Sequence, residues 1–151
     1  MNCGEICKQK VVTVQEFDEL SRATKLMRDR HVGYLIVVEP LPIDAKLRPI
    51  GVLTDRDIVV GVLAKEADVR SLRVGDVMTR QPVVVGEEQP VSFALKEMRR
   101  IGVRRIPIVG VAGTLVGVLS LDDVIDVLSG ELMEVSKSIQ SELRMERDLR
   151  T

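Results

Sequence analysis

Two short phrases in the chain place a hydroxyl and a carboxylate three residues apart, where an apolar run ends. The first phrase, GVLTDRD, contributes Thr54 and Asp57; the second, GVLSLDD, contributes Ser120 and Asp123. A carboxylate can accept hydrogen bonds from two adjacent hydroxyls, as on a ribose, and a neighbouring hydroxyl can bond the same sugar or a phosphate. Helix capping alone would account for one hydroxyl or one acid of each pair, but not for both. The doubled pair therefore predicts a binding site at each phrase.

The residues before each phrase also repeat. Residues 12–14 (VTV) match residues 83–85 (VVV) at an offset of 71, and the matches continue to residues 37–38 and 108–109. The offset then falls to 66, because the first half carries five extra residues within a proline-bearing loop at 39–47. Insertions are tolerated best in exposed loops. An internal repeat of this kind dictates the architecture.

Hydrophobic periodicity and turn residues predict the same β-α-β-β-α order in both halves. This order predicts an α+β fold with pseudo-twofold symmetry, its repeats spanning residues 5–65 and 70–129. The first repeat is expected to hold a strand at 11–14, a helix from Gln15 or Asp18 to Arg30, strands at 34–39 and 49–53, and a helix from Thr54 or Asp55 to Lys65. The second is expected to hold a helical turn at 74–78, a strand at 82–85, a helix at 88–101, a hairpin of 106–109 and 114–119, and a helix from Leu121 or Asp122 to Leu128.

The C-terminal segment, residues 131–151, is predicted to form a charged amphipathic helix. Leu132, Val135, Ile139, Leu143 and Met145 are spread among many charged residues there. Such a helix can pack on its own module or on a second subunit, or it can dock another protein.

The composition favours a core of aliphatic side chains. Phe17, Tyr34 and Phe93 are the aromatic residues of the 151-residue chain. The formal net charge of −1 indicates neither a nucleic-acid nor a membrane partner. The longest apolar run is too short to span a bilayer, and the N-terminus lacks the apolar region of a signal peptide, so a cytoplasmic protein is expected.

The residues that most often carry catalysis or bind metals are scarce. Cys3 and Cys7 form a CxxxC pair without a second cluster, which favours ordinary thiols over a metal or redox site. His31, the single histidine, falls at a predicted helix end, where a cation is favourable. The chain has no paired nucleophile and base and no phosphate-binding loop of the GxxxxGK(S/T) type. We therefore expect neither catalytic residues nor a metal site.

The two phrases, the β-α-β-β-α order and the stretch RRIPIV at 104–109 together resemble the cystathionine β-synthase (CBS) domain family. The segment VGDVMT at 74–79 is similar to the lead-in that precedes a repeat of that family. The resemblance covers residues 5–128 and implies a tandem pair of CBS repeats, called a Bateman module. It further implies two clefts related by the pseudo-twofold that commonly bind AMP, ADP, ATP or other adenosyl compounds.

The resemblance also implies roles for individual residues. Asp57 and Asp123 would hold ribose hydroxyls, and Thr54 and Ser120 would bond the ribose or a phosphate. Apolar strand residues would sandwich a purine, and guanidinium groups suit phosphate oxygens. The candidates for the apolar slot are Val12, Val32, Val83, Val103, Ile106 and Pro107, and the candidates for the phosphate are Arg56, Arg104 and Arg105.

The basic pair is present in one repeat alone. Arg104 and Arg105 have Gly33 and Tyr34 as their counterparts in the first repeat. We therefore predict the better site near Ser120 and Asp123, served by the arginine pair, and a weaker one near Thr54 and Asp57, where Arg56 could compensate.

These features predict a stand-alone, non-catalytic regulatory module that binds an adenine nucleotide and signals through conformation or oligomerisation. The family resemblance implies a homodimer formed through the helices at 55–64 and 121–128, and a regulated protein partner of unknown identity. No cofactor is obligatory, although Mg²⁺ can accompany a polyphosphate. The alternative is a structural adaptor or oligomerisation module that has no small-molecule ligand.

Overall fold

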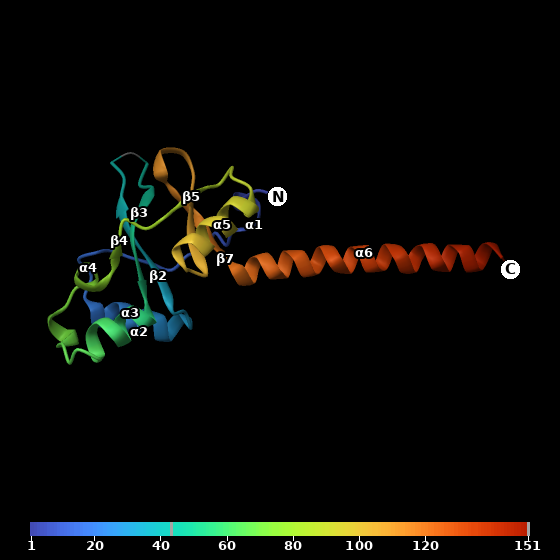
Figure 1. The fold of residues 1–151 in the computed structure, drawn as a ribbon. Helices are drawn as coiled ribbons and strands as arrows, with labels where there is room; N and C mark the ends of the chain where they lie inside the picture. The colour runs from blue at the N-terminus through green and yellow to red at the C-terminus, as the bar shows by residue number, and fades with distance from the viewer. Residues whose placement is uncertain (43, 151) are drawn as a thin grey trace.

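A computed structural model describes residues 1–42 and 44–150, which form two β-sheets with flanking helices and one long projecting helix (Figure 1). The predicted α+β fold with two β-α-β-β-α repeats is confirmed. The first repeat comprises β1 (Thr13–Val14), α2 (Leu20–Arg30), β2 (Tyr34–Pro40), β3 (Leu47–Thr54) and α3 (Asp55–Ile58), which continues as a π-helical turn (Val59–Leu63). The second comprises β5 (Val85–Gly86), α5 (Val91–Ile101), β6 (Arg105–Val109), β7 (Leu115–Ser120) and α6 (Leu121–Leu149). Shorter elements are α1 (Cys3–Ile6), α4 (Val74–Val77), β4 (Thr79–Arg80) and single 3₁₀ turns at Val69–Ser71 and Val111–Gly113.

The two sheets have the same pairing pattern. The first has the order β1-β2-β3-β4 and the second β5-β6-β7. Each begins with a parallel pair and continues with an antiparallel hairpin. Tyr34 lies opposite Thr54 in the first hairpin, as Arg105 lies opposite Ser120 in the second. The register therefore puts the two predicted polar pairs at equivalent strand ends.

Each sheet is covered by a helix with the same buried spacing. Leu20, Ala23 and Met27 of α2 are buried in the first core, and the residues 71 positions later in α5 are buried in the second. The spacing of three and four residues keeps one helical face on the sheet. Aliphatic burial on both sheets thus provides the rigid base that carries the strand ends.

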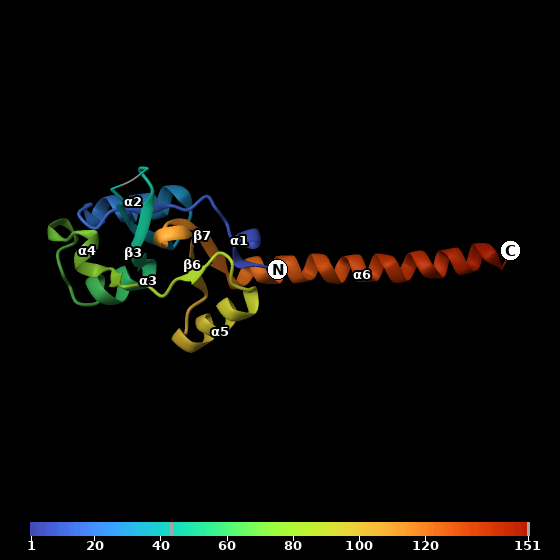
Figure 2. The same cartoon turned by 90° about the horizontal axis from the view of Figure 1, so that it is seen from above.

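The lead-in segment before each repeat crosses to the other repeat. Val74 and Met78 at α4 are buried in the first core, and β4 pairs with β3. Cys3 and Cys7 at α1 are buried in the second core, and Lys8 pairs with Val118 of β7. Figures 1 and 2 show the N-terminus beside the second repeat. The crossing ties the two repeats together.

The crossing also explains the glycine that opens each phrase. A Cβ on Gly51 would lie 2.7 Å from Met78 Sδ, and a Cβ on Gly117 would lie 2.5 Å from the carbonyl oxygen of Lys8. Such distances are too short for a real Cβ, so only glycine lets the other repeat's lead-in pass this closely.

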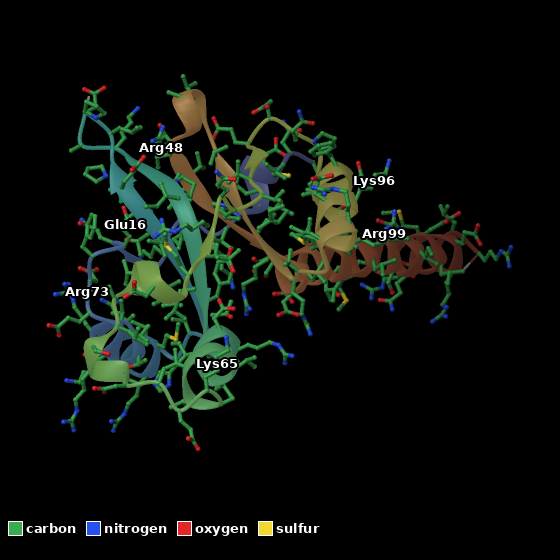
Figure 3. The ribbon with its side chains drawn as sticks, turned by 60° about the vertical axis from the view of Figure 1, so that its left-hand side comes forward. Glu16, Arg48, Lys65, Arg73, Lys96 and Arg99 are labelled. Carbon is green, nitrogen blue, oxygen red and sulfur yellow. The ribbon has the colours of Figure 1, made fainter. Side chains whose placement is uncertain are left out.

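The first crossing is further held by polar contacts around Glu16 and Arg73, which Figure 3 labels near α4. Arg73 donates to the carbonyl oxygen of Phe17 at 3.1 Å, and Arg80 forms an ion pair with Glu16 at 3.1 Å. These contacts fix the start of the second repeat against the first.

Several predicted boundaries are wrong. The expected strand at 11–14 shortens to β1, and the strand expected at 82–85 is found as β5 at Val85–Gly86. The helix α2 begins at Leu20, because the carboxylate of Asp18 accepts a hydrogen bond from the backbone N–H of Gln15 at 2.9 Å and forms a turn. The helix expected to reach Lys65 is α-helical only to Ile58 before the π-helical turn.

Two further differences concern the chain ends. The short helix α1 was not expected, and the helices expected at 121–128 and 131–150 are one continuous helix, α6. Ile43, within the predicted loop, and Thr151 lie outside the described residues. Within the described part of the chain, none of the helices has both the length and the apolarity required to cross a membrane.

Candidate functional site

Two clefts lie where the repeats meet, and each combines residues of both repeats. The Thr54 cleft has a volume of about 630 Å³, and the Ser120 cleft has a volume of about 270 Å³. The Thr54 cleft is lined by Gly33, Tyr34, Val52, Thr54, Asp55, Arg56, Asp57, Thr79, Gln81, Pro82, Val83, Ile101, Gly102, Val103, Arg104, Arg105 and Pro107. The Ser120 cleft is lined by Lys8, Lys10, Val11, Val12, His31, Val32, Gly33, Tyr34, Arg105, Val118, Ser120, Asp122 and Asp123.

The same capping box places the hydroxyl and the carboxylate in both clefts. The backbone N–H of Asp57 donates to Thr54 Oγ1 at 3.1 Å, and that of Thr54 donates to Asp57 Oδ2 at 2.9 Å. The corresponding distances between Ser120 and Asp123 are both 3.1 Å. The expectation that capping would need only one residue of each pair is therefore wrong, because a capping box uses both.

The carboxylates of Asp57 and Asp123 differ in which oxygen atoms remain available to a ligand. Asp123 is 8% exposed, and its Oδ1 lies 3.0 Å from Lys8 Nζ, so both of its oxygens are engaged. Asp57 is half-buried, and its Oδ1 has no partner among the described residues. Of the two capping-box carboxylates, only Asp57 thus presents an oxygen ready to accept a hydrogen bond from a ligand.

The ionisation of Asp123 reflects these contacts. Burial, the largest influence, acts to raise the pKa of Asp123, but hydrogen bonds from Ser120 and Lys8 outweigh it and hold the pKa below its usual range. The carboxylate of the Ser120 cleft is therefore kept charged and internally neutralised.

The arginine pair lies as predicted only in part. Arg104 lines the Thr54 cleft and forms an exposed ion pair with Asp122 at 3.4 Å. Arg105 lines both clefts, with its guanidinium 5.8 Å from the centre of the Tyr34 ring. The predicted association with Ser120 and Asp123 is thus wrong for Arg104, because the end of β6 faces the phrase of the other repeat, whereas Arg105 does line the Ser120 cleft as well as the Thr54 cleft.

Tyr34 forms part of the boundary between the clefts. Its side chain is largely buried, and this burial raises the pKa of Tyr34 although Arg105 acts against the rise. The neutral ring therefore gives Arg105 an aromatic face to stack on, which positions the guanidinium.

The predicted apolar slot is only partly correct. Val83, Val103 and Pro107 line the Thr54 cleft, whereas Val12 and Val32 line the Ser120 cleft. Ile106 was predicted to line a slot, but it is fully buried in the second core, where it lies opposite Leu119. Strand alternation turns Ile106 inward, away from the cleft.

Sequence reasoning missed the basic side chains of the Ser120 cleft. Lys8, Lys10 and His31 all line it. An offset of 71 pairs Lys8 with Thr79 and Lys10 with Gln81 of the Thr54 cleft, so extending the repeat alignment toward the N-terminus would have found both. By contrast, Lys96 and Arg99 on the outer side of α5 line neither cleft (Figure 3).

The cysteines belong to the core. Cys3 and Cys7 are buried, and burial raises the pKa of both thiols. At the offset of 71 they correspond to Val74 and Met78, which occupy equivalent places in the other core. Among the described residues no group of three or more His, Cys, Asp or Glu side chains could hold a metal ion.

Comparison with known proteins agrees with this architecture. The family model for the CBS domain matches residues 3–63 and 74–130. The chain therefore belongs to the CBS domain family and contains two CBS repeats. It is 29% identical over 146 residues to the uncharacterized protein MK0525 of Methanopyrus kandleri, covering 95% of this chain and 72% of that protein.

Two solved structures are similar in fold and sequence. The hexameric CBS-CP12 protein from bloom-forming cyanobacteria has a TM-score of 0.70 and 32% identity, over 83% of this chain and 66% of that chain. The CBS domain protein PAE2072 from Pyrobaculum aerophilum, complexed with AMP, has a TM-score of 0.70 and 27% identity, over 82% of this chain and 89% of that chain.

Proposed function

We propose that the chain is a non-catalytic regulatory module that binds an adenine nucleotide in the Thr54 cleft. The observation that carries the proposal is the combination found there: an available carboxylate oxygen, an apolar lining and three guanidinium groups, drawn from both repeats. The AMP complex of the similar protein PAE2072 supports the ligand class.

In this proposal Asp57 holds the ribose. Its Oδ2 stays in the capping box while Oδ1 accepts from the sugar hydroxyls. Thr54, one turn of helix earlier, lies at the same strand end and can bond the ribose or the first phosphate. A pre-ordered carboxylate loses little freedom on binding, which favours affinity.

The purine would enter the apolar part of the cleft. Val83, Val103 and Pro107 come from the second repeat, and Val52 comes from the first. Aliphatic walls can enclose a base without aromatic stacking, as in most small-molecule sites. The base would then contact mainly the second repeat, and the ribose would contact the first.

The phosphates would meet Arg56, Arg104 and Arg105. The ion pair between Arg104 and Asp122 is exposed, and such pairs contribute only about 0–1 kcal/mol, so Arg104 can exchange Asp122 for a phosphate at little cost. Titration with ATP in the presence and absence of Mg²⁺ tests whether a polyphosphate brings the ion with it.

Ser120 and Asp123 would form a weaker second site. Lys8 already neutralises Asp123, and the Ser120 cleft has less than half the volume of the Thr54 cleft. A ribose would have to displace Lys8 from Asp123 before it could bind.

A nucleotide that bridges the repeats would change their relative placement, and a ligand shifts such an equilibrium by its differential affinity for the two states. The helices at 55–64 and 121–128 carry exposed apolar side chains that support a homodimer as the route of the signal. These residues are Val59, Val60, Leu63, Ile125 and Leu128. The regulated protein would read the changed shape or assembly.

The test is isothermal titration of the protein with AMP, ADP and ATP, beside Asp57→Asn and the matched variant Asp123→Asn. We expect one dominant binding event that Asp57→Asn weakens strongly and Asp123→Asn leaves nearly unchanged. Equal loss in both variants would contradict the assignment to the Thr54 cleft.

The second candidate function is an adaptor without a ligand, which the long exposed helix α6 favours. A thermal-shift screen with adenosine compounds distinguishes the two functions. A ligand at a hundredfold excess over its Kd stabilises the folded state by about 2.7 kcal/mol. No shift with any adenosine compound would favour the adaptor.

A further inference from the structure

The helix α6 leaves the body and continues without packing against it. Every residue from 128 to 150 is exposed. Figures 1 and 2 show the helix projecting away from both sheets. Helices in proteins are stabilised mainly by packing of an apolar face, so a helix that projects without packing invites a partner.

One face of α6 carries a continuous apolar stripe. Its six side chains are between 48% and 70% exposed. They recur at intervals of three or four residues, which keeps them on one side of the helix over about 27 Å. The α6 stripe consists of Ile125, Leu128, Leu132, Val135, Ile139 and Leu143.

The charges along α6 are divided between its two halves. Residues 121–135 contain five acids and no base, whereas residues 136–150 contain four bases and three acids. A parallel pair of these helices would align the acidic halves, and an antiparallel pair would set each acidic half against the more basic one. Opposite charges favour the antiparallel arrangement.

The residues along one edge of the stripe are also complementary to one another in an antiparallel pair. In chain order they are Asp122, Ser129, Ser136, Gln140 and Arg147. The midpoint between Asp122 and Arg147 falls between residues 134 and 135, and the midpoint of the stripe falls at residue 134. One antiparallel register thus brings Ile125 opposite Leu143 while Arg147 meets the partner's Asp122.

We propose that α6 pairs in antiparallel orientation with α6 of a second copy of this chain, centred near residue 134. A lipid surface fits less well, because membrane-surface helices carry Lys and Arg on the polar face and α6 is predominantly acidic. The α6 pair shares Ile125 and Leu128 with the homodimer surface proposed for the two repeats, so the two interfaces are alternatives for one protomer. The α6 pair does not depend on a nucleotide.

Sedimentation analysis of the full chain carrying Val60→Asp/Leu63→Asp, which disrupts the homodimer surface proposed for the repeats, tests the pairing. We expect a concentration-dependent dimer that Leu132→Asp/Ile139→Asp converts to monomer. The control Met133→Asp/Ser141→Asp adds the same charge off the stripe and should leave the dimer intact. A monomeric Val60→Asp/Leu63→Asp protein, or a dimer that survives Leu132→Asp/Ile139→Asp in that background, would overturn the proposal and leave another protein as the occupant of the stripe.

Disulfide formation tests the orientation. Ile125→Cys and Leu143→Cys are made as separate proteins, mixed and oxidised, with the wild type, whose Cys3 and Cys7 are buried, as the control. An antiparallel pair should give the mixed disulfide between positions 125 and 143, detected by mass spectrometry. Disulfides formed only between identical variants would show a parallel pair and refute the antiparallel register.

Discussion

The two clefts begin with the same capping box and differ in what faces it. Asp57 meets a cleft of about 630 Å³ with three arginines, whereas Asp123 meets Lys8 in a cleft of about 270 Å³. The difference arises within the phrases at Arg56, whose counterpart is Asp122, and outside them at the lead-ins and at the start of β2 and β6. Because each cleft takes its capping box from one repeat and its facing residues from the other, a change in one repeat alters the site of its neighbour.

The largest expected effect is the loss of nucleotide binding in Asp57→Asn. Hydrogen bonds to a charged acceptor contribute about 1.5–3 kcal/mol, and a neutral amide forfeits much of this. We expect affinity for AMP to fall about 10- to 100-fold in calorimetric titration. Asp123→Asn should change it less than about threefold, and a larger effect of Asp123→Asn would reverse the comparison of the clefts.

The next effect is a phosphate-specific loss in Arg105→Gln. Removal of one guanidinium should weaken AMP about tenfold, because charge-assisted hydrogen bonds to phosphate are stronger than neutral ones. Affinity for adenosine, measured in the same way, should stay unchanged. A parallel loss of adenosine binding would instead indicate that Arg105 acts by packing on Tyr34.

The next prediction is that Lys8→Met allows the Ser120 cleft to bind a nucleotide. With Lys8 removed, Asp123 Oδ1 becomes available, and a second AMP should bind in titration, raising the stoichiometry from one toward two. Lys8 is exposed but Asp123 is buried, so losing the cation leaves a buried carboxylate oxygen unpaired and should lower the stability by about 1–3 kcal/mol. Lys10 lines the same cleft but forms no ion pair with Asp123 among the described residues. Lys10→Met should therefore keep a stoichiometry of one.

The smallest effect concerns acid stability. The pKa of Asp123 lies below its usual range, so its charged form adds stability above the unfolded-state pKa, and this stability is lost as pH falls through the folded-state pKa. Asp123→Asn should therefore flatten the acid side of the unfolding free energy measured against pH. Lys8→Met should flatten it in part. Profiles that superimpose on the wild type would show that the Asp123 contacts are absent in solution.

The repeat and its fold could be predicted from sequence because they follow from periodicity and turn residues. Matching residues in α2 and α5 keep the same buried spacing, and both phrases end a strand. Local signals of this kind are contained in windows of ten to twenty residues. The π-helical turn after Ile58 and the late start of α2 depend on side-chain contacts that periodicity does not report.

The grouping of site residues could not be predicted in the same way, because it depends on packing between the repeats. The sequence places Arg104 and Arg105 a short distance from Ser120, yet Arg104 lines only the Thr54 cleft. The prediction for Ile106 was wrong for a different reason. Neighbouring residues of a strand point to opposite faces, so Ile106 lies in the core while Arg105 and Pro107 line the cleft. The partner of Asp123 was missed because Lys8 precedes the aligned segment.

The most direct test of the account is a crystal structure of the protein grown with AMP. The account predicts one nucleotide in the Thr54 cleft, with its ribose hydroxyls on Asp57 and its phosphate among Arg56, Arg104 and Arg105, while Lys8 remains on Asp123. A nucleotide bound only in the Ser120 cleft, with Lys8 displaced from Asp123, would contradict it.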